Sequence, residues 1–244
     1  MPVEPMPVEP MPIEPVPIEL VIFDCDGTLM DSERIAAEVE AHMLSEAGIA
    51  ITADEFEQRF AGTSTGQAMA ILEEETGRTL PDDHKNKVDA EIVHRFRTQV
   101  RTVEGAAEVL DRFDQPRCVC SNSTMEKLEA ELRRGRLWDR FRPYIFSAED
   151  LPDCRVKPAP DVFLHACREF DVAPRAALVL EDSVAGVTAA AAAGCRVVGF
   201  AGASHVRPGH ADRLTEAGAE TVVNRLLDLP ELIAVFGEWE GAAP

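Results

Sequence analysis

The chain has 244 residues, 45% of them hydrophobic, and a formal net charge of −20, so it can bury one large core or two smaller ones. The negative charge excludes a general binder of nucleic acid or of anionic membranes, because both need a basic face. No apolar run reaches the ~18–20 residues of a membrane span, and no secretory signal pattern opens the chain. We therefore expect a cytoplasmic protein, and a monomer.

The N-terminal segment, residues 1–19, is a pentapeptide repeat that reads MPVEP, MPVEP, MPIEP and VPIE. Proline at this density forbids a helix and favours an extended polyproline conformation. The repeat predicts a flexible leader outside the fold, with an arm that binds a partner as the alternative. At the other end, residues 237–244 are expected to form a short tail.

The first strand is expected at Leu20–Phe23, an apolar run that ends at Asp24 and suits a buried strand of a parallel sheet. Helical patterns without a convincing strand follow at 32–48, 53–61, 65–76 and 82–101. Residues 33–103 are therefore predicted to form an all-helical domain, inserted directly after the first strand.

From residue 104 onward, helices and strands alternate, which predicts a parallel α/β sheet of Rossmann-like type with helices on both faces. Strands are expected at 118–120, 144–146, 177–180, 197–200 and 221–223. Helices are expected at 105–113, 124–134, 160–170, 184–193, 210–217 and 226–236. Residues 20–32 and 104–236 would thus form one α/β core.

Polar residues follow four of these segments, at the sheet edge where open α/β folds gather functional groups. The four clusters are Asp24-Cys25-Asp26-Gly27-Thr28, Ser121-Asn122-Ser123, Lys157-Pro158 and Glu181-Asp182-Ser183. Two acids after a buried strand are costly without a metal or another cation nearby. An acid, a hydroxyl, a lysine and an acidic pair are therefore expected to meet at one site.

In these clusters the sequence resembles the haloacid dehalogenase superfamily, from residue 20 to about 236. Its four motifs are matched in order by the DxDGT loop at Asp24–Thr28, by Ser121, by Lys157-Pro158, and by Glu181-Asp182 with Gly186. The helical insert resembles the cap domain of the subgroup that contains β-phosphoglucomutase and phosphoglycolate phosphatase. The resemblance implies a phosphotransferase with a helical cap over an α/β core.

The resemblance also implies a role for each motif residue. Asp24 would attack phosphorus and form an aspartyl-phosphate. Asp26 would protonate the leaving oxygen and then deprotonate the attacking water. Ser121, Asn122 and Lys157 would bind the phosphate of the substrate. Ser121 and Lys157 are also expected catalytic groups, beside the two aspartates.

Mg²⁺ is the cofactor that the resemblance implies, because this ion prefers a few hard oxygen ligands. Asp24 and Asp182 would supply carboxylates, and Asp26 its backbone carbonyl. Glu181 would act through a bound water or in support of the other ligands.

Three departures from the mutases of this family favour hydrolysis. Those enzymes carry a histidine, a lysine and an arginine in the cap where this chain has Ala36, Ala61 and Thr65. A mutase must hold the distal phosphate of a bisphosphate with cations. The sequence therefore predicts a phosphatase of small sugar phosphates or sugar-acid phosphates, with a mutase of β-phosphoglucomutase type as the alternative. Dehalogenation is disfavoured, because dehalogenases of the family lack the second aspartate, Asp26.

The cap loop offers candidates for substrate selection in Arg59, Thr63, Ser64 and Thr65. Hydroxyls suit a polyol or a sugar acid, and an arginine suits a carboxylate. Thr63 could instead cap the next helix, and Arg59 could lie on a solvated face. A sensor of phosphorylated ligands is an alternative of another class, although a sensor has no need of a nucleophile.

Overall fold

The computed structural model describes residues 16–60 and 63–238, so most of the leader, part of the cap loop and the end of the tail lie outside the described residues. Ile18 is buried, and the Glu19 amide donates to the carbonyl of Ala176 over 2.8 Å. The core thus begins slightly before residue 20, where the sequence pattern placed it.

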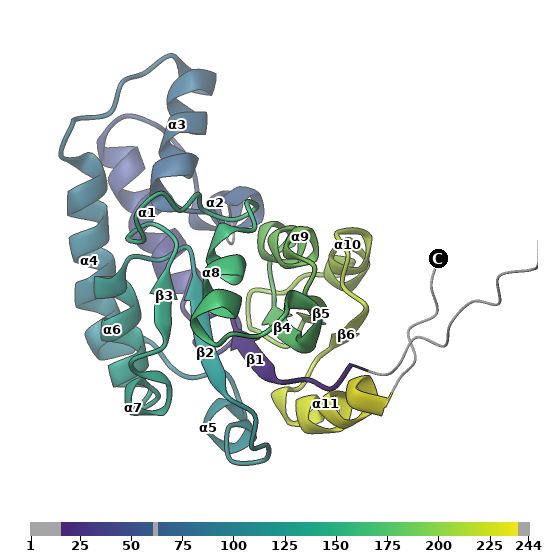
Figure 1. Cartoon of the computed structure of the whole chain (residues 1–244). Helices are drawn as coiled ribbons and strands as arrows, with labels where there is room; N and C mark the ends of the chain where they lie inside the picture. The colour runs from purple at the N-terminus through teal and green to yellow at the C-terminus, as the bar shows by residue number, and fades with distance from the viewer. Residues whose placement is uncertain (1–15, 61–62, 239–244) are drawn as a thin grey trace, which may run out of the picture.

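A parallel sheet forms the centre of the fold, with its strands in the order β3-β2-β1-β4-β5-β6 (Figure 1). The strands are β1 (Leu20–Phe23), β2 (Arg117–Ser121), β3 (Ile145–Ser147), β4 (Ala177–Glu181), β5 (Arg196–Phe200) and β6 (Thr221–Val223). Phe23 at the end of β1 pairs with Val119 on one side and Leu180 on the other. The loop after β1 therefore opens between the carboxyl ends of β2 and β4.

Helices cover both faces of this sheet. The core helices are α5 (Ala106–Val109), α6 (Met125–Arg134), α7 (Trp138–Phe141), α8 (Asp161–Glu169), α9 (Val184–Ala193), α10 (His210–Glu216) and α11 (Leu229–Glu238), with 3₁₀ turns η1 (Pro174–Ala176) and η2 (Leu226–Asp228). Val21 and Phe23 of β1 pack toward α6, α7 and α11, while Leu20 and Ile22 pack toward α8, α9 and α10. Both faces of β1 are fully buried, as its apolar sequence predicts.

The cap consists of α1 (Glu33–Glu46), α2 (Ala53–Phe60), α3 (Thr65–Thr76) and α4 (His84–Gln99), inserted after β1 and seated over the carboxyl ends of the strands (Figure 1). The predicted α/β core with a helical insertion is confirmed. No helix in the described part of the chain is long and apolar enough to cross a membrane.

Two short linkers join the cap to the core, and they run side by side. The Asp31 amide donates to the Arg101 carbonyl, and the Val103 amide donates to the Leu29 carbonyl, each over 2.9 Å. We call this pair, residues 29–31 and 101–103, the linker ribbon.

Two short elements differ from the sequence prediction. The helix expected at 105–113 is a single turn, α5, followed by turns. The helix α7 has only four residues, too few to leave a helical period in the sequence.

Candidate active site

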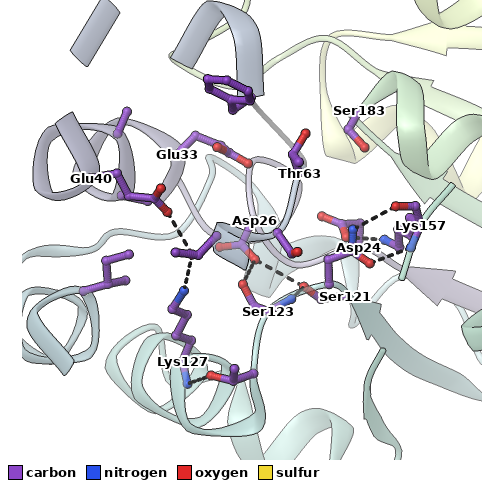
Figure 2. Close-up of a pocket in the computed structure, with 18 of the residues that line it drawn as sticks. Asp24, Asp26, Glu33, Glu40, Thr63, Ser121, Ser123, Lys127, Lys157 and Ser183 are labelled. Atoms are coloured by element: carbon purple, nitrogen blue, oxygen red, sulfur yellow. Dashed lines mark hydrogen bonds and ion pairs between the residues drawn. The ribbon is translucent and has the colours of Figure 1, made fainter. Parts of the chain in front are cut away.

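A pocket lies between the cap and the carboxyl ends of β1, β2 and β4 (Figure 2). Its floor comes from the loops after these strands, and its roof comes from the cap helices. All four sequence clusters at the sheet edge reach its lining, through Asp24, Ser121, Lys157 and Asp182. The structure thus brings the four motif clusters together at one place.

Asp24 and Lys157 form a buried ion pair at the floor of the pocket. The Lys157 Nζ lies 2.6 Å from Asp24 Oδ1 and 2.7 Å from Glu181 Oε2, and it donates to the Cys120 carbonyl over 2.9 Å. Burial and the neighbouring Glu181 raise the pKa of Asp24 well above its usual value, against the opposing effect of Lys157. Burial lowers the pKa of Lys157, but the two carboxylates more than offset this effect, so the lysine stays charged.

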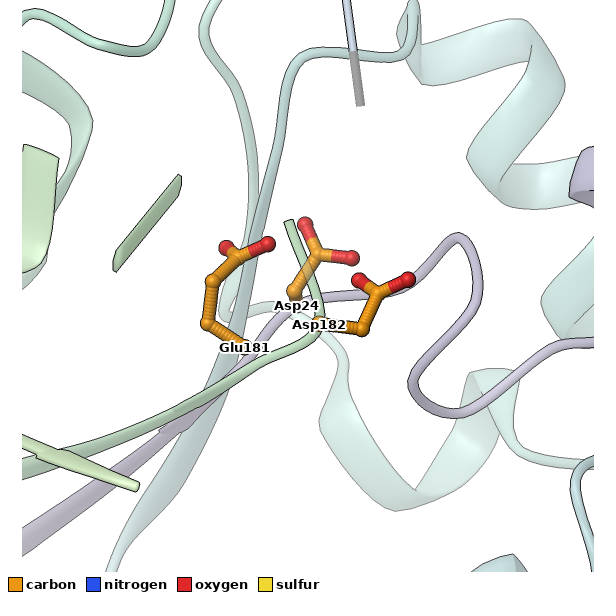
Figure 3. Close-up of side chains that lie close together, drawn as sticks. All are labelled: Asp24, Glu181 and Asp182. Atoms are coloured by element: carbon orange, nitrogen blue, oxygen red, sulfur yellow. The ribbon is translucent and has the colours of Figure 1, made fainter. Parts of the chain in front are cut away.

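Three buried carboxylates meet beside this lysine (Figure 3). Asp24, Glu181 and Asp182 each offer an oxygen atom within 4.8 Å of the others. Lys157 balances one of the three negative charges, which leaves an excess that a divalent cation would neutralise. Hard carboxylate oxygens of this kind suit Mg²⁺, so the residues fit the ion that the sequence predicts.

Asp182 is held from three sides by residues distant in sequence. Thr28 Oγ1 donates to its Oδ1 over 3.1 Å, and His205 Nε2 lies 3.2 Å from its Oδ2. His210 Nε2 lies 2.6 Å from its backbone carbonyl. Burial lowers the pKa of His205, but the hydrogen bond to Asp182 and the negative charges of Asp182, Glu33 and Glu57 together more than offset burial and raise the pKa to about 9. The sequence analysis missed both histidines, which follow β5 in a region without a recognisable motif.

Asp26 points away from the carboxylate group and toward three hydroxyls. Ser32 Oγ donates to its Oδ1 over 2.7 Å, while Ser123 and Ser121 donate to its Oδ2 over 2.8 and 3.2 Å. The side chain is thereby fixed at the edge of the pocket, beside Asp24 in sequence but with its own partners. A metal contact from Asp26 through its backbone carbonyl stays a prediction.

Asn122 holds the main chain of Lys157. Its Oδ1 accepts from the Lys157 amide over 2.8 Å, and its Nδ2 donates to the Lys157 carbonyl over 3.4 Å. Asn122 also lines the pocket, so it both fixes the lysine and lies where a substrate would bind.

Two glycines are required by the close approach of acidic side chains. Gly27 has φ +75°, and a Cβ there would lie 2.0 Å from Asp182 Oδ2. A Cβ on Gly186 would lie 2.0 Å from Glu181 Cδ. Gly186 therefore makes room for the Glu181 carboxylate.

The cap loop reaches the pocket with some of its predicted residues. Thr63, Ser64 and Thr65 line the pocket, and Ser64 caps α3 by accepting from the Gln67 amide over 3.3 Å. Arg59 is absent from this lining, because its guanidinium pairs with Glu75 over 2.6 Å on the surface. A contact of Arg59 with the substrate stays a prediction, and it would require this ion pair to open.

Two buried charged residues on the cap side escaped the sequence analysis. Glu40 of α1 and Lys127 of α6 both line the pocket, and Thr65 lies between them. Each is one of several charged residues in its helix, so no local motif distinguishes it from a solvated position.

A family model for haloacid dehalogenase-like hydrolases matches residues 18–194. The chain belongs to this family. It is 32% identical over 221 residues to the 6-phosphogluconate phosphatase of Escherichia coli (strain K12), across 90% of this chain and 96% of the relative. The predicted family and the enzyme class, a hydrolase with phosphatase relatives, are confirmed.

Solved structures with the same fold support this assignment. A haloacid dehalogenase-like protein from Agrobacterium tumefaciens is 46% identical, with a TM-score of 0.79 over 91% of this chain and 100% of that one. A family hydrolase from Deinococcus radiodurans with bound phosphate and sodium is 29% identical, with a TM-score of 0.72 over 93% and 100%. The fold is also shared with a putative β-phosphoglucomutase from Thermotoga maritima, 25% identical with a TM-score of 0.65 over 89% of this chain and 99% of that one, and with a predicted phosphoglycolate phosphatase from Haemophilus somnus, 19% identical with a TM-score of 0.73 over 88% and 97%.

Proposed function

We propose that the chain is a Mg²⁺-dependent phosphatase that hydrolyses a small phosphorylated metabolite, a sugar phosphate or a sugar-acid phosphate, through an aspartyl-phosphate on Asp24. The observation that carries the proposal is the buried contact of 2.6 Å between Asp24 and Lys157 beneath a pocket. A nucleophile that pairs with a cation at the floor of a pocket suits attack on an anionic phosphate.

In the first step, a carboxylate oxygen of Asp24 bonds to phosphorus while the bond from phosphorus to the substrate oxygen breaks. Asp26 gives its proton to that leaving oxygen. Lys157 and Ser121 hold the equatorial phosphate oxygens. When Mg²⁺ is bound by Asp24 and Asp182, it neutralises charge on the nucleophile and on the phosphate.

In the second step, Asp26 takes a proton from a water molecule, whose oxygen bonds to phosphorus as the bond to Asp24 breaks. The same residue thus acts first as an acid and then as a base. The hydroxyls of Ser32, Ser121 and Ser123 keep its carboxylate in one place for both tasks.

The relatives support the substrate class. One is named for 6-phosphogluconate, another for pseudouridine 5′-phosphate and another for validoxylamine A 7′-phosphate. These names share a phosphate on a hydroxylated carbon skeleton. A hydroxyl-rich pocket in this chain, with Thr63, Ser64 and Thr65 in its lining, suits the same class.

The test is phosphate release by the purified protein from a panel of phosphorylated metabolites, with Mg²⁺ and with a chelator. We expect release with Mg²⁺, and its loss in Asp24→Asn, which should still bind ligand by calorimetry. Release that survives in Asp24→Asn would overturn the mechanism. Conversion of β-glucose 1-phosphate into glucose 6-phosphate, without phosphate release, would favour the mutase.

A further inference from the structure

The pocket has a second polar group on the side away from Asp24 and Lys157 (Figure 2). It consists of Glu40 from α1, Thr65 from α3 and Lys127 from α6, and we call it the distal wall. Thr65 Oγ1 donates to Glu40 Oε1 over 2.8 Å and accepts from Lys127 Nζ over 3.1 Å. The three side chains form one chain of hydrogen bonds across the boundary between cap and core.

These residues are as buried as the catalytic group. Glu40 and Thr65 are each 5% exposed, and Lys127 is 7% exposed. Burial of polar groups is costly unless their hydrogen bonds are made. The distal wall is therefore a part of the interior that needs an explanation.

One atom of the distal wall has no partner. Glu40 Oε2 is buried and makes no hydrogen bond within the described residues, although it belongs to a residue that lines the pocket. An unsatisfied buried acceptor has lost its hydration without gaining a hydrogen bond in return. A ligand hydroxyl at this position would donate to it and supply that hydrogen bond.

Lys127 can complement this acceptor. Its ammonium has three N–H donors, of which Thr65 takes one, and a second faces Asp89 Oδ1 in an ion pair of 2.7 Å. The described contacts leave the third donor for a ligand oxygen. The ion pair with Asp89 also balances the charge of Lys127. The lysine therefore offers a ligand a hydrogen-bond donor and not an uncompensated positive charge.

The remaining charge near the distal wall disfavours a second anion. The acidic lining residues include Glu33, Glu40, Glu57 and Glu149, and the described lining provides Lys127 as the base on this side. Arg207 and Lys85, outside the lining, pair with Glu57 and Glu149 over 3.2 and 3.1 Å, so no unpaired cation is added for an anionic ligand. A carboxylate or a second phosphate would meet these acids. Neutral hydroxyl groups of a ligand would instead meet the acceptor of Glu40 and the donor of Lys127.

We propose that Glu40, Thr65 and Lys127 bind hydroxyl groups at the end of the substrate opposite its phosphate, so that the enzyme selects uncharged sugar or polyol phosphates over sugar-acid phosphates and bisphosphates. The proposal rests on the proposed phosphatase function and narrows its substrate class. It assigns specificity to residues outside the four motifs.

The distal wall is complete only when the cap is seated on the core. Glu40 and Thr65 belong to the cap, whereas Lys127 belongs to the core helix α6. A substrate that bridges them favours the seated cap over an open one, because it adds hydrogen bonds that only the seated form offers.

The experiment compares sorbitol 6-phosphate with 6-phosphogluconate, which share a six-carbon hydroxylated chain but differ at the end away from the phosphate. p-Nitrophenyl phosphate, which lacks such hydroxyls, is the third substrate. For the wild-type protein, we expect kcat/KM for sorbitol 6-phosphate to exceed that for 6-phosphogluconate by about tenfold or more. The name of the Escherichia coli relative points to the opposite order, so the comparison is decisive.

Two substitutions locate this preference at Glu40. Glu40→Met removes the acceptor at similar size, and we expect kcat/KM for sorbitol 6-phosphate to fall about 10–100-fold, with p-nitrophenyl phosphate changed less than about twofold. Glu40→Gln removes the negative charge, and we expect the ratio of the two sugar substrates to shift toward 6-phosphogluconate. Glu46→Met, on the exposed face of the same helix, is the matched control. It should leave kcat/KM for sorbitol 6-phosphate unchanged relative to p-nitrophenyl phosphate and relative to 6-phosphogluconate.

Binding separates this proposal from the proposed function. Calorimetry on Asp24→Asn, with and without Glu40→Met, measures affinity for both sugar ligands whether or not they are hydrolysed. Tighter binding of sorbitol 6-phosphate, lost with Glu40→Met, would support the distal wall. Equal or tighter binding of 6-phosphogluconate, or equal losses for all ligands, would overturn it. Absence of phosphate release by the wild-type protein would contradict the proposed phosphatase function but not the binding role of the distal wall.

Discussion

Three carboxylates crowd together at the core end of the pocket, whereas Glu40 lies apart from them at the cap end. Asp24, Glu181 and Asp182 offer oxygens within 4.8 Å of one another, and Asp24 and Glu181 share the buried Lys157. Glu40 shares a single threonine with its nearest lysine. Burial raises the pKa of Glu40 to about 7, against the opposing effect of Lys127.

The difference follows from what each end has to do. Crowded carboxylates repel one another and call for a cation, which is the condition for holding a metal and an anionic phosphate. An isolated carboxyl group needs only hydrogen bonds, and it can give or accept them according to its protonation. Concentrated charge thus suits the proposed phosphoryl transfer, and a separate acceptor suits the proposed selection of the substrate.

The largest effect is expected from removing the acid at the core end. In Asp26→Asn, kcat for sugar phosphates should fall about 10²–10⁴-fold, because the leaving oxygen and the attacking water lose their proton donor and acceptor. p-Nitrophenyl phosphate has a good leaving group, so its first step should survive in the variant. Rapid-mixing assays should then show a burst of about one nitrophenolate per active site, as expected for a slow second step. A variant without a burst would place Asp26 in the first step for every substrate.

A second prediction tests the tight packing at the core end. In Gly186→Ala, the new Cβ would lie 2.0 Å from Glu181 Cδ, so Glu181 must move and disturb Lys157. We expect the free energy of unfolding to fall by about 1–3 kcal/mol and kcat to fall by about tenfold or more.

The matched control is Gly66→Ala in α3, where the Cβ would lie 3.5 Å from Lys85 Cε, an ordinary contact. Helix propensity predicts a gain of up to about 1 kcal/mol there. Urea titrations and kcat of both variants decide the matter. Similar stability changes in the two proteins would show that Glu181 has room to move.

A third prediction concerns the cap end and pH. The folded-state pKa of Glu40 is raised to about 7, with burial the main cause, Lys127 and Thr65 opposing it, and Asp89 adding to it. A raised acid pKa means that the folded protein loses stability as pH rises from the unfolded value through the folded one.

Glu40→Gln, which stays neutral, should therefore be more stable than the wild-type protein at pH 8, by up to about 3 kcal/mol, and nearly equal at pH 4.5. Urea unfolding of both proteins at the two pH values measures the difference. A variant that is less stable at pH 8 would show that the ionised carboxylate is well stabilised by Lys127.

The smallest effect is expected at the rim where cap and core meet. Lys85 Nζ of the cap lies 3.1 Å from Glu149 Oε2 of the core, with both side chains partly exposed. A double-mutant cycle with Lys85→Met and Glu149→Gln should give a coupling of about 0.5 kcal/mol that fades in 1 M salt. The Lys87–Asp83 pair, more exposed and within the cap alone, should couple still less. A coupling energy that persists in 1 M salt would show that the Lys85–Glu149 pair holds the cap on the core more strongly than its exposure predicts.

The core end could be predicted from the sequence because its chemistry is written in short contiguous motifs. Asp24 follows a fully apolar strand, and Glu181 and Asp182 close another, so the topology of a parallel sheet brings them together. The strand assignments were accurate for the same reason, since buried parallel strands read as continuous apolar runs.

The cap end could not be predicted in this way, because its residues come from separate helices whose packing is decided by apolar neighbours. Nothing near Glu40 or Lys127 in the sequence says that the two share Thr65. Arg59 shows the same limit, because its pairing with Glu75 on the surface is not evident from its place beside the cap loop. His205 reaches Asp182 only through the path of the loop after β5.

The linker ribbon has a consequence for how such proteins diversify. Because the chain leaves the core at residues 29–31 and returns beside the same place at 101–103, the cap is attached at a single point. A segment whose two ends lie together can be transplanted into another core without moving any strand of the sheet. A chimera joined at the linker ribbon should keep the reaction of the protein that supplies its core. It should take from the cap donor the part of the substrate specificity that the cap residues determine, whereas Lys127 would come from the core.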